Sequence, residues 1–547
     1  MSGPIDTNDG VEPVELDAVV IGTGFAGLLA LHVLRNDLDL EVRAFDDAPG
    51  VGGTWYWNCY PGARADTEVT AYCYSFDRDL FDSWRWSERY PRQPEILAYL
   101  NHVADRFDLR RSITLETRVL SATFDEAVNR WIVVTDGGER LAARFLIEGV
   151  GLLSSTNMPA FPGQETFTGD IFHTARWPQV GTDFRGKRVG VIGTGSSGVQ
   201  VITEIAPEAD HLTVFQRSAQ YSVPARHGTI DTDFLESIHA DYDGYWQRVR
   251  NSITGFGFEE SSTPAGSVTD EEREAIFERW WEHGGGFQFM FATFSDIGVD
   301  IFANNAATDF IKRKIAAIVT DPETARMLTP TDLYAKRPLC CDNYFETYNR
   351  SNVSLVDVKA DPIVQITPRG IRTRDREYEL DVIVFATGFD AVTGNTLKIA
   401  HTGRAGVDLA DHWAHRPKTH LGLMTSGFPN MFTMFGPMGP FTNQPPADEV
   451  QIEWIAEAIR YLQKTGSDTI EPAAETEAAW VATCDEIGNS TLFPKVDSWI
   501  NGANVPGKPV TIMFYMAGLG SYAEQLRTAQ DDEYPGFLFT ATDRTPA

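Results

Sequence analysis

The chain has 547 residues, which at roughly 150 residues per domain is enough for three or four folding units. Apolar residues make up 42% and charged residues 22%, so disorder, collagen, coiled coil and small disulfide scaffolds are excluded. With 46 basic and 77 acidic residues the formal charge is −31, which repels nucleic acid and anionic lipid. We expect a globular protein of enzyme size that binds neither nucleic acid nor membrane.

The cysteines and the N-terminal segment indicate the compartment. The five cysteines form no CxxC pair and no regular disulfide spacing, as expected in a reducing environment. No apolar run approaches the roughly 18 residues of a membrane-spanning helix, and residues 1–17 are acidic with no apolar signal core. The sequence therefore predicts a cytoplasmic protein.

One local pattern occurs twice: a β-branched run, a GxGxxG turn and a helix. Such glycines allow a tight turn and let a pyrophosphate approach the free N–H groups at the helix start. The repeat predicts an α/β fold with two Rossmann-like dinucleotide-binding domains. The candidate binding residues are Gly22, Gly24, Phe25 and Gly27 in the first copy, and Gly193, Gly195, Ser196, Ser197 and Gly198 in the second.

The end of the next expected strand distinguishes the two copies. Asp46 lies 24 residues after Gly22, and Arg217 lies 24 residues after Gly193. An acid at this place accepts hydrogen bonds from a ribose 2′-OH, whereas an arginine pairs with a 2′-phosphate. We infer that one dinucleotide has a free ribose and that the other is phosphorylated.

Residues 231–330 differ in character from the repeats and predict a helical insertion. Thr269 and Glu272 form a capping box at the start of one helix, which Gly284 can end. A second helix, with apolar residues on one face, is expected to stop near Asp321. The aromatic side chains of this insertion are interpreted as packing rather than as a cofactor site.

Two apolar runs later in the chain predict a return to sheet structure. Residues 381–388 are a buried-strand run that a glycine closes, and residues 428–437 are a second run that ends in turn residues. The chain is therefore expected to leave its sheets and to re-enter them.

Two dinucleotide sites in one chain indicate hydride transfer from a nicotinamide at one site to a flavin at the other. The alternative is that both sites bind a nicotinamide cofactor. A disulfide reductase would place CxxC beside the flavin, and Cys340 and Cys341 lack that spacing. The histidines are dispersed and form no HxxxH or HExxH motif, so no metal site is expected. Molecular oxygen acting on reduced flavin is then the economical electron acceptor.

Residues 167–178 fit the pattern FxGxxxHxxxW followed by Pro, and they lie just before the second GxGxxG. In this long and rare pattern the chain resembles the type I Baeyer–Villiger monooxygenases. Related flavin-containing and N-hydroxylating monooxygenases usually carry Tyr-Lys where this sequence has Trp177-Pro178. The motif residues are Phe167, Gly169, His173 and Trp177, and a second family signature spans residues 53–66 with Thr54, Trp55 and Asp66.

The resemblance extends over nearly the whole chain and is closest to the cyclohexanone monooxygenases. The segments 149–154, 255–260, 336–340, 436–443 and 498–507 carry it. Departures are mild: the family usually has Glu at the place of Asp46, often Thr at the place of Ser218, and commonly Arg at the place of Cys59. Asp46 still accepts from a ribose, and Ser218 still offers a hydroxyl.

The resemblance implies an activity that needs FAD, NADPH and molecular oxygen. NADPH would reduce FAD, and oxygen would form a C4a-peroxyflavin that adds to a ketone and inserts one oxygen beside the carbonyl. The product is an ester, or a lactone from a cyclic aliphatic ketone such as cyclohexanone, and no obligatory protein partner is implied. A fixed cation would stabilise the anions that develop. Arg337 is the candidate catalytic cation, and Asp66 would position it.

The same resemblance assigns the remaining residues. Asp46, Thr54 and Trp55 join the first glycine turn in binding FAD, and Arg217, Ser218 and Lys336 would bind the 2′-phosphate of NADPH. His173 is interpreted as structural or conformational rather than as a base. The ketone pocket and the mobile loop over it would use Leu152, Leu153, Phe441 and Trp499, the last of which would pack on NADP⁺ or the substrate.

The implied domains are interleaved. The FAD-binding domain is expected to comprise residues 1–150 and 386–547, the latter with the mobile substrate loop, and the NADP-binding domain residues 151–230 and 331–385, with the helical insertion at 231–330. Two rival functions remain. One is a flavin N- or S-oxygenase, and the other is a non-enzymatic NADP-responsive flavoprotein, against which the presence of both Arg337 and Asp66 argues.

Overall fold

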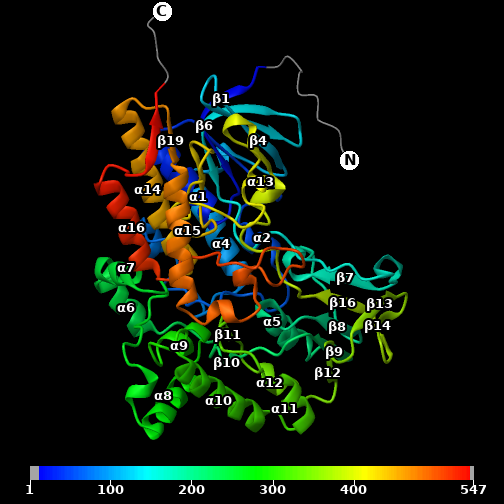
Figure 1. Ribbon diagram of the computed structural model, residues 1–547. Helices are drawn as coiled ribbons and strands as arrows, with labels where there is room; N and C mark the ends of the chain where they lie inside the picture. The colour runs from blue at the N-terminus through cyan, green and yellow to red at the C-terminus, as the bar shows by residue number, and fades with distance from the viewer. Residues whose placement is uncertain (1–11, 542–547) are drawn as a thin grey trace, which may run out of the picture.

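Two β-sheets organise the part of the chain that the computed structural model describes, residues 12–541 (Figure 1). Residues 1–11 of the acidic N-terminal segment lie outside it. The larger sheet has the strand order β17-β4-β5-β6-β1-β2-β3, with β18 beside β6. Its strands are β1 (Val14–Ile21), β2 (Val42–Phe45), β3 (Ile113–Thr114), β4 (Val119–Asp125), β5 (Arg130–Thr135), β6 (Arg140–Glu148), β17 (Ala400–Thr402) and β18 (Met431–Thr433).

The smaller sheet is parallel throughout and has the strand order β12-β9-β8-β16-β7. Its strands are β7 (Asp170–His173), β8 (Arg188–Ile192), β9 (His211–Gln216), β12 (Val353–Asp357) and β16 (Val382–Phe385). Short strands form three further small sheets. One pairs β10 (Ser222–Val223) with β11 (Leu339–Cys340), and another pairs β19 (Thr469–Pro472) with β20 (Phe537–Thr540). In the third, β14 (Gly370–Thr373) lies between β13 (Ile363–Thr367) and β15 (Glu377–Glu379).

The chain leaves both sheets and re-enters them, as the apolar runs predict. The run at 381–388 forms β16, between β8 and β7, so this prediction is confirmed. The run at 428–437 was expected to be a longer strand than it is: β18 spans three residues, Met431–Thr433. Phe435 inside the run and Met438 just after it have left-handed φ angles of 52° and 63°, which an extended strand does not allow.

Both GxGxxG segments form the predicted strand–turn–helix. Helix α1 (Phe25–His32) follows β1, and α5 (Ser196–Ile205) follows β8. A Cβ on Gly27 would lie 1.9 Å from the carbonyl oxygen of Gly22, so only glycine lets the helix start pack onto the turn. The remaining helices that flank the sheets are α2 (Thr54–Trp57), α3 (Arg78–Ser83), α4 (Gln93–Arg106), α12 (Tyr344–Thr347), α13 (Leu409–His412), α14 (Gln444–Thr465), α15 (Ala474–Asn489) and α16 (Leu519–Asp531).

The insertion is helical as predicted. Thr269 and Glu272 form the expected capping box of α8, and Gly284 ends that helix. The second predicted helix ends at Ile318, close to the stop expected near Asp321, and Asp321 caps a further short helix. The insertion consists of α6 (Thr232–Ala240), α7 (Tyr242–Asn251), α8 (Asp270–His283), α9 (Gly286–Phe291), α10 (Ile301–Ile318) and α11 (Pro322–Leu328).

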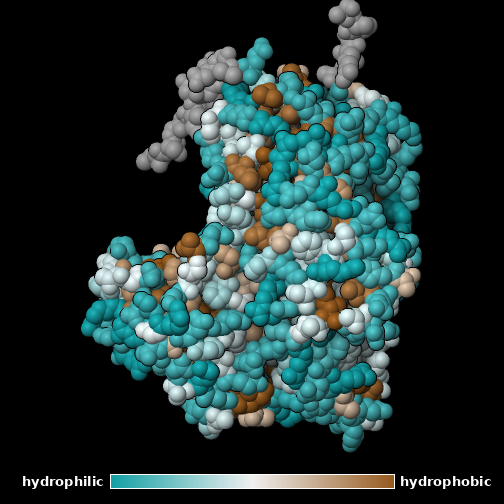
Figure 2. Space-filling model, turned by 180° about the vertical axis from the view of Figure 1, so that it is seen from behind, coloured by the Kyte–Doolittle hydropathy of each residue, from teal (hydrophilic) through white to brown (hydrophobic). Residues whose placement is uncertain are grey.

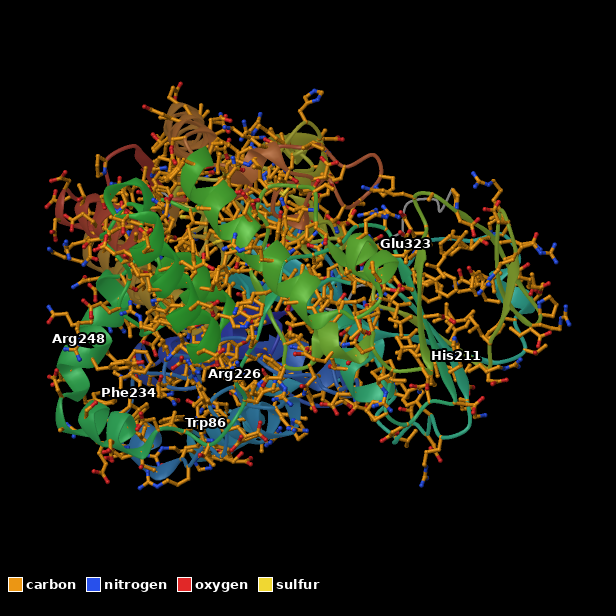
Figure 3. All side chains as sticks on the ribbon, turned by 90° about the horizontal axis from the view of Figure 1, so that it is seen from below. Trp86, His211, Arg226, Phe234, Arg248 and Glu323 are labelled. Carbon is orange, nitrogen blue, oxygen red and sulfur yellow. The ribbon has the colours of Figure 1, made fainter. Side chains whose placement is uncertain are left out.

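The insertion is shared between two hydrophobic cores. Helices α6 and α7 pack their apolar side chains into the same core as α1 and α14, which flank the larger sheet. Helices α8 to α11 instead contribute to the core beside the smaller sheet. Seen from below, Phe234 and Arg248 of the first pair lie on one side of the view, whereas Glu323 of α11 lies on the other side, with His211 of β9 (Figure 3). The sequence pattern does not distinguish these two halves.

The surface agrees with the acidic, polar composition. Seen from behind, it is mainly hydrophilic, with apolar side chains in small separate patches, and the smaller sheet unit stands out from the larger one (Figure 2). Among the described residues, no helix is long and apolar enough to cross a membrane.

Candidate active site

One cavity of about 1860 Å³ is lined by residues of both glycine-rich turns. It also reaches Asp66, Arg337 and Trp499, which come from three separate segments of the chain. Two ligands bound at the two turns would therefore share one cavity.

The starts of α1 and α5 fit a pyrophosphate. The capping residues of the two helices are Gly24 and Gly195, and neither places a side chain on the free N–H groups. A Cβ on Gly195 would project into open space at the cavity wall. Free N–H donors at a helix start favour an anion. Of the other predicted turn residues, Gly22, Phe25, Gly193, Ser196 and Ser197 line the cavity, whereas Gly27 and Gly198 lie behind it and pack the helices onto the turns.

Asp46 is fixed at the edge of the first site. Its Oδ2 accepts from the N–H of Thr23 at 2.7 Å, and its Oδ1 accepts from the N–H of Ala48 at 2.9 Å. Burial raises the pKa of this carboxyl, although the hydrogen bonds from Ala48 and Thr23 oppose the shift. The Thr23 hydroxyl also donates to Oδ2, at 2.8 Å. Only Oδ1 therefore retains a lone pair, through which Asp46 can still accept from a ribose hydroxyl. Thr54 and Trp55 lie on the same wall.

Three predicted phosphate-binding residues meet at the second site. Arg217, Ser218 and Lys336 all line the cavity, and Arg217 is exposed. The Nζ of Lys336 donates to Asp332 at 2.7 Å, so this lysine is already paired with an acid of its own segment. Arg217 is therefore the stronger candidate for a 2′-phosphate.

Arg337 and Asp66 form a two-point ion pair on the cavity wall. The Nη1 of Arg337 donates to Asp66 Oδ2, and its Nη2 donates to Oδ1 at 2.6 Å. Burial alone would lower the pKa of the Arg337 guanidinium, but the charge of Asp66 and the hydrogen bonds to it outweigh burial and raise that pKa. The arginine therefore stays charged at any working pH, and its side chain retains 25% exposure toward the cavity.

The rest of the cavity is apolar and aromatic. Leu152, Leu153, Phe441 and Trp499 line it as predicted. The ring centroid of Phe514 lies 5.3 Å from that of Phe441 and 6.0 Å from that of Trp499. Further aromatic side chains on the cavity wall cannot be found from the sequence pattern, because they come from separate helices and loops and share no common period. These are Phe256, Phe287, Phe291, Phe493 and Phe514.

Within residues 167–178, Ala175 and Arg176 line the cavity, whereas the motif residues Phe167, Gly169, His173 and Trp177 do not. His173 Nδ1 accepts from the N–H of Ala175 at 3.0 Å, so Nε2 carries the proton and faces Thr387 Oγ1 at 3.2 Å. Burial lowers the pKa of His173. Trp177 is buried, and a Cβ on Gly169 would lie 2.2 Å from the carbonyl oxygen of Asp381. These contacts support a structural role for the motif.

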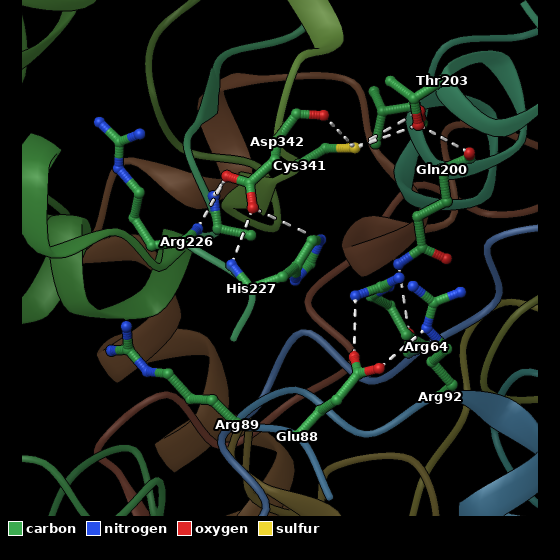
Figure 4. A network of polar contacts seen from close by, with 12 residues as sticks. Arg64, Glu88, Arg89, Arg92, Gln200, Thr203, Arg226, His227, Cys341 and Asp342 are labelled. Carbon is green, nitrogen blue, oxygen red and sulfur yellow. Dashed lines mark hydrogen bonds and ion pairs between the residues drawn. The ribbon is translucent and has the colours of Figure 1, made fainter. Parts of the chain in front are cut away.

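A polar network joins the segment before Asp66 to helix α5 (Figure 4). Tyr60 donates to Gln200 Oε1 at 2.8 Å, and Gln200 Nε2 donates to the carbonyl oxygen of Arg64 at 3.2 Å. The guanidinium of Arg64 pairs with Glu88 at 3.4 Å. Helix α5 starts at the second glycine turn, so this network ties the segment that leads to Asp66 to the helix of the second candidate binding site.

Comparisons with known proteins agree with this arrangement. The family described as flavin-binding monooxygenase-like matches residues 17–228. A Baeyer–Villiger monooxygenase of Pseudooceanicola batsensis is 54% identical over 97% of this chain and 97% of its own. The crystal structure of cyclohexanone monooxygenase from Rhodococcus sp. Phi1, bound to NADP⁺, has a TM-score of 0.95 and 52% identity, covering 97% of this chain and all of that one.

The chain belongs to the Baeyer–Villiger monooxygenase family. The resemblance and the α/β fold predicted from the sequence are thereby confirmed. Family members of this similarity do not all carry the same name: phenazine N-monooxygenase PhzNO1 of Lysobacter antibioticus is 51% identical over 96% of this chain and 97% of its own. Membership of the family therefore does not fix the substrate of this chain, which has to be inferred from the residues of its own cavity.

Proposed function

We propose that this protein inserts one atom of O₂ beside the carbonyl of a ketone, with NADPH as the electron donor, to give an ester or lactone. FAD and NADP(H) are its cofactors. The Arg337–Asp66 pair carries the proposal: it places a permanently charged guanidinium on the wall of a cavity that both glycine turns line. We expect the cyclic aliphatic ketones, cyclohexanone among them, to be the preferred substrates.

The residues present fit the two cofactors. We propose that Gly22, Gly24 and Asp46 hold FAD and that Gly193, Gly195 and Arg217 hold NADPH, within interleaved domains bounded as the sequence predicts. Bound FAD, once reduced by NADPH, supplies the electrons that activate O₂. Every other contribution comes from the side chains of this chain.

The side chains that line the cavity have three proposed roles. Arg337 stabilises the negative charge that develops on the carbonyl oxygen of the ketone, and Asp66 holds its guanidinium in one orientation. Leu152, Leu153 and Phe441 bind the uncharged ketone by apolar contact. Trp499 covers the pocket and keeps water out, which favours oxygenation over the release of hydrogen peroxide.

N-oxygenation of an aromatic heterocycle is the second candidate. It is supported by the phenazine N-monooxygenase relative and by the many phenyl rings on the cavity wall, which suit a flat aromatic ligand. A charged arginine is not required when a ring nitrogen attacks as the nucleophile, so we rank this candidate below ketone oxygenation.

One experiment separates the candidates. The purified protein is incubated in air with NADPH and, in turn, with cyclic ketones, linear ketones, phenazine and a thioether, and mass spectrometry detects the gain of one oxygen. A lactone from a cyclic ketone supports the proposal. Oxygenated phenazine without any lactone would favour the second candidate. NADPH consumption that no substrate accelerates, with no oxygenated product, would reject both.

A further inference from the structure

The segment 498–512 carries Trp499 on the cavity wall near one end and Lys508 near the other. Its only regular element is the short turn Trp499–Asn501. Gly502 and Gly507 inside it have left-handed φ angles of 84° and 83°, which allow sharp reversals of the chain. A segment with so little regular structure depends on side-chain contacts to stay in one place.

Lys508 makes such a contact. Its Nζ donates to Asp390 Oδ1 and to the carbonyl oxygen of Ala391, both at 2.6 Å. The Lys508 side chain is 10% exposed and that of Asp390 is 35% exposed. A partly buried, charge-assisted pair of this kind is stronger than an ion pair in full solvent. Asn504 adds a second attachment, because its Nδ2 donates to the carbonyl oxygen of Phe389 at 2.8 Å.

Asp390 lies where the two segments that connect the sheets run side by side. The N–H of Asp390 donates to the carbonyl oxygen of Ser155, and the N–H of Val392 donates to that of Leu152, both at 2.8 Å. Residues 149–157 lead from the larger sheet to the smaller one, and residues 386–392 lead back. Lys508 is thus attached to the pair of connecting segments, one of which carries Leu152 of the cavity wall.

We propose that Lys508 and Asp390 form a latch that positions Trp499 over the substrate pocket by tying its segment to both connections between the sheets. The inference rests on the proposed function, because it gives Trp499 the task of covering the ketone. Lys508 and Asp390 are positioning residues: they touch neither turn that binds a dinucleotide, and they act through the placement of residues 498–507.

The test compares Lys508→Met, Asp390→Asn and the double variant with the unchanged full-length protein carrying bound flavin. Hydrogen–deuterium exchange of peptides covering residues 498–512 is measured without ketone or NADPH. We expect each single variant to exchange about tenfold faster in this segment. The double variant should be no faster than Lys508→Met, because Lys508→Met already removes the ion pair that Asp390→Asn breaks, together with the bond to Ala391. Lys464→Met, an exposed lysine at the end of α14, serves as the matched control with unchanged exchange.

Kinetics supply the second measurement. We expect the KM for the ketone to rise about fivefold in both single variants, with kcat changed less than twofold, and more hydrogen peroxide to be released for each NADPH consumed. Unchanged exchange of the segment in both single variants, or additive effects in the double variant, would overturn the latch. If the unchanged protein oxygenates no ketone, the proposed function fails, whereas the exchange experiment still decides whether the latch exists.

Discussion

The guanidinium of Arg337 meets the carboxylate of Asp66 across 271 residues of sequence, and the two form parallel hydrogen bonds on the cavity wall. The ring of Phe287 lies 5.1 Å from the guanidinium carbon. Asp66 therefore fixes the plane of the cation, and the phenyl ring packs against it. A charge held in this way needs no reorganisation when an anion develops beside it.

Replacing Arg337 with Ala is expected to lower ketone oxygenation by about 100-fold or more, the effect of removing one preorganised charge stabiliser. The protein should still bind FAD, because the hydrogen bonds of Arg337 go to Asp66 rather than to the first glycine turn, and Arg337 is not among the proposed FAD ligands. Product formation and the flavin absorbance of the purified variant measure the two effects. Substantial lactone from Arg337→Ala would contradict the assignment. Arg337→Lys is the control variant, because it keeps the positive charge but loses the two-point geometry.

Replacing Arg217 with Asp is expected to raise the KM for NADPH several-fold or more, because a cation opposite the 2′-phosphate becomes an anion. The KM for NADH, which lacks that phosphate, should change much less. Steady-state kinetics with the two donors therefore provide their own control. An NADPH dependence equal to that of the unchanged protein would remove Arg217 from the site, leaving Lys336 and Ser218 as candidates.

Local patterns in the sequence predict local structure well. The two GxGxxG segments and the capping box of Thr269 depend on neighbouring residues alone, so spacing and residue type suffice to find them. The shortened strand β18 shows the limit of this reasoning. An apolar run can be buried in a turn as well as in a strand, and the positive φ angles after Met431–Thr433 are not visible in the run itself.

Long-range contacts could not be derived from the residue pattern. That Arg337 faces Asp66 was implied by a family resemblance, and no periodicity connects them. The same holds for the contact of Lys508 with Asp390 and for the division of the insertion between two cores. Each depends on how distant elements pack, which tertiary structure alone decides.

Replacing His173 with Asn tests whether the motif histidine takes part in proton transfer. Burial lowers the pKa of His173, so the ring is neutral through the working range above pH 6.5. We expect the pH profile of kcat to keep its shape in His173→Asn, while activity falls because the contact with Thr387 is lost. Loss of an inflection that the unchanged protein shows would instead identify His173 as an acid or base.

His420 should make the protein sensitive to acid. Burial lowers the pKa of this imidazole to about 4, whereas in the unfolded chain the pKa is about 6.5. Above pH 6.5 the ring is neutral in both states. As the pH falls from 6.5 toward 4, only the unfolded chain takes up the proton, so the free energy of unfolding decreases, by on the order of 2 kcal/mol at pH 5.

Urea unfolding at pH 7.5 and pH 5 measures this loss. In His420→Leu the decrease between the two pH values should be smaller than in the unchanged protein by about that amount, because the group that binds the extra proton is gone. His415→Leu, at an exposed histidine five residues earlier, should leave the decrease unaltered. If His420→Leu and the unchanged protein lose equal stability at pH 5, the buried ring is not the source of the acid sensitivity.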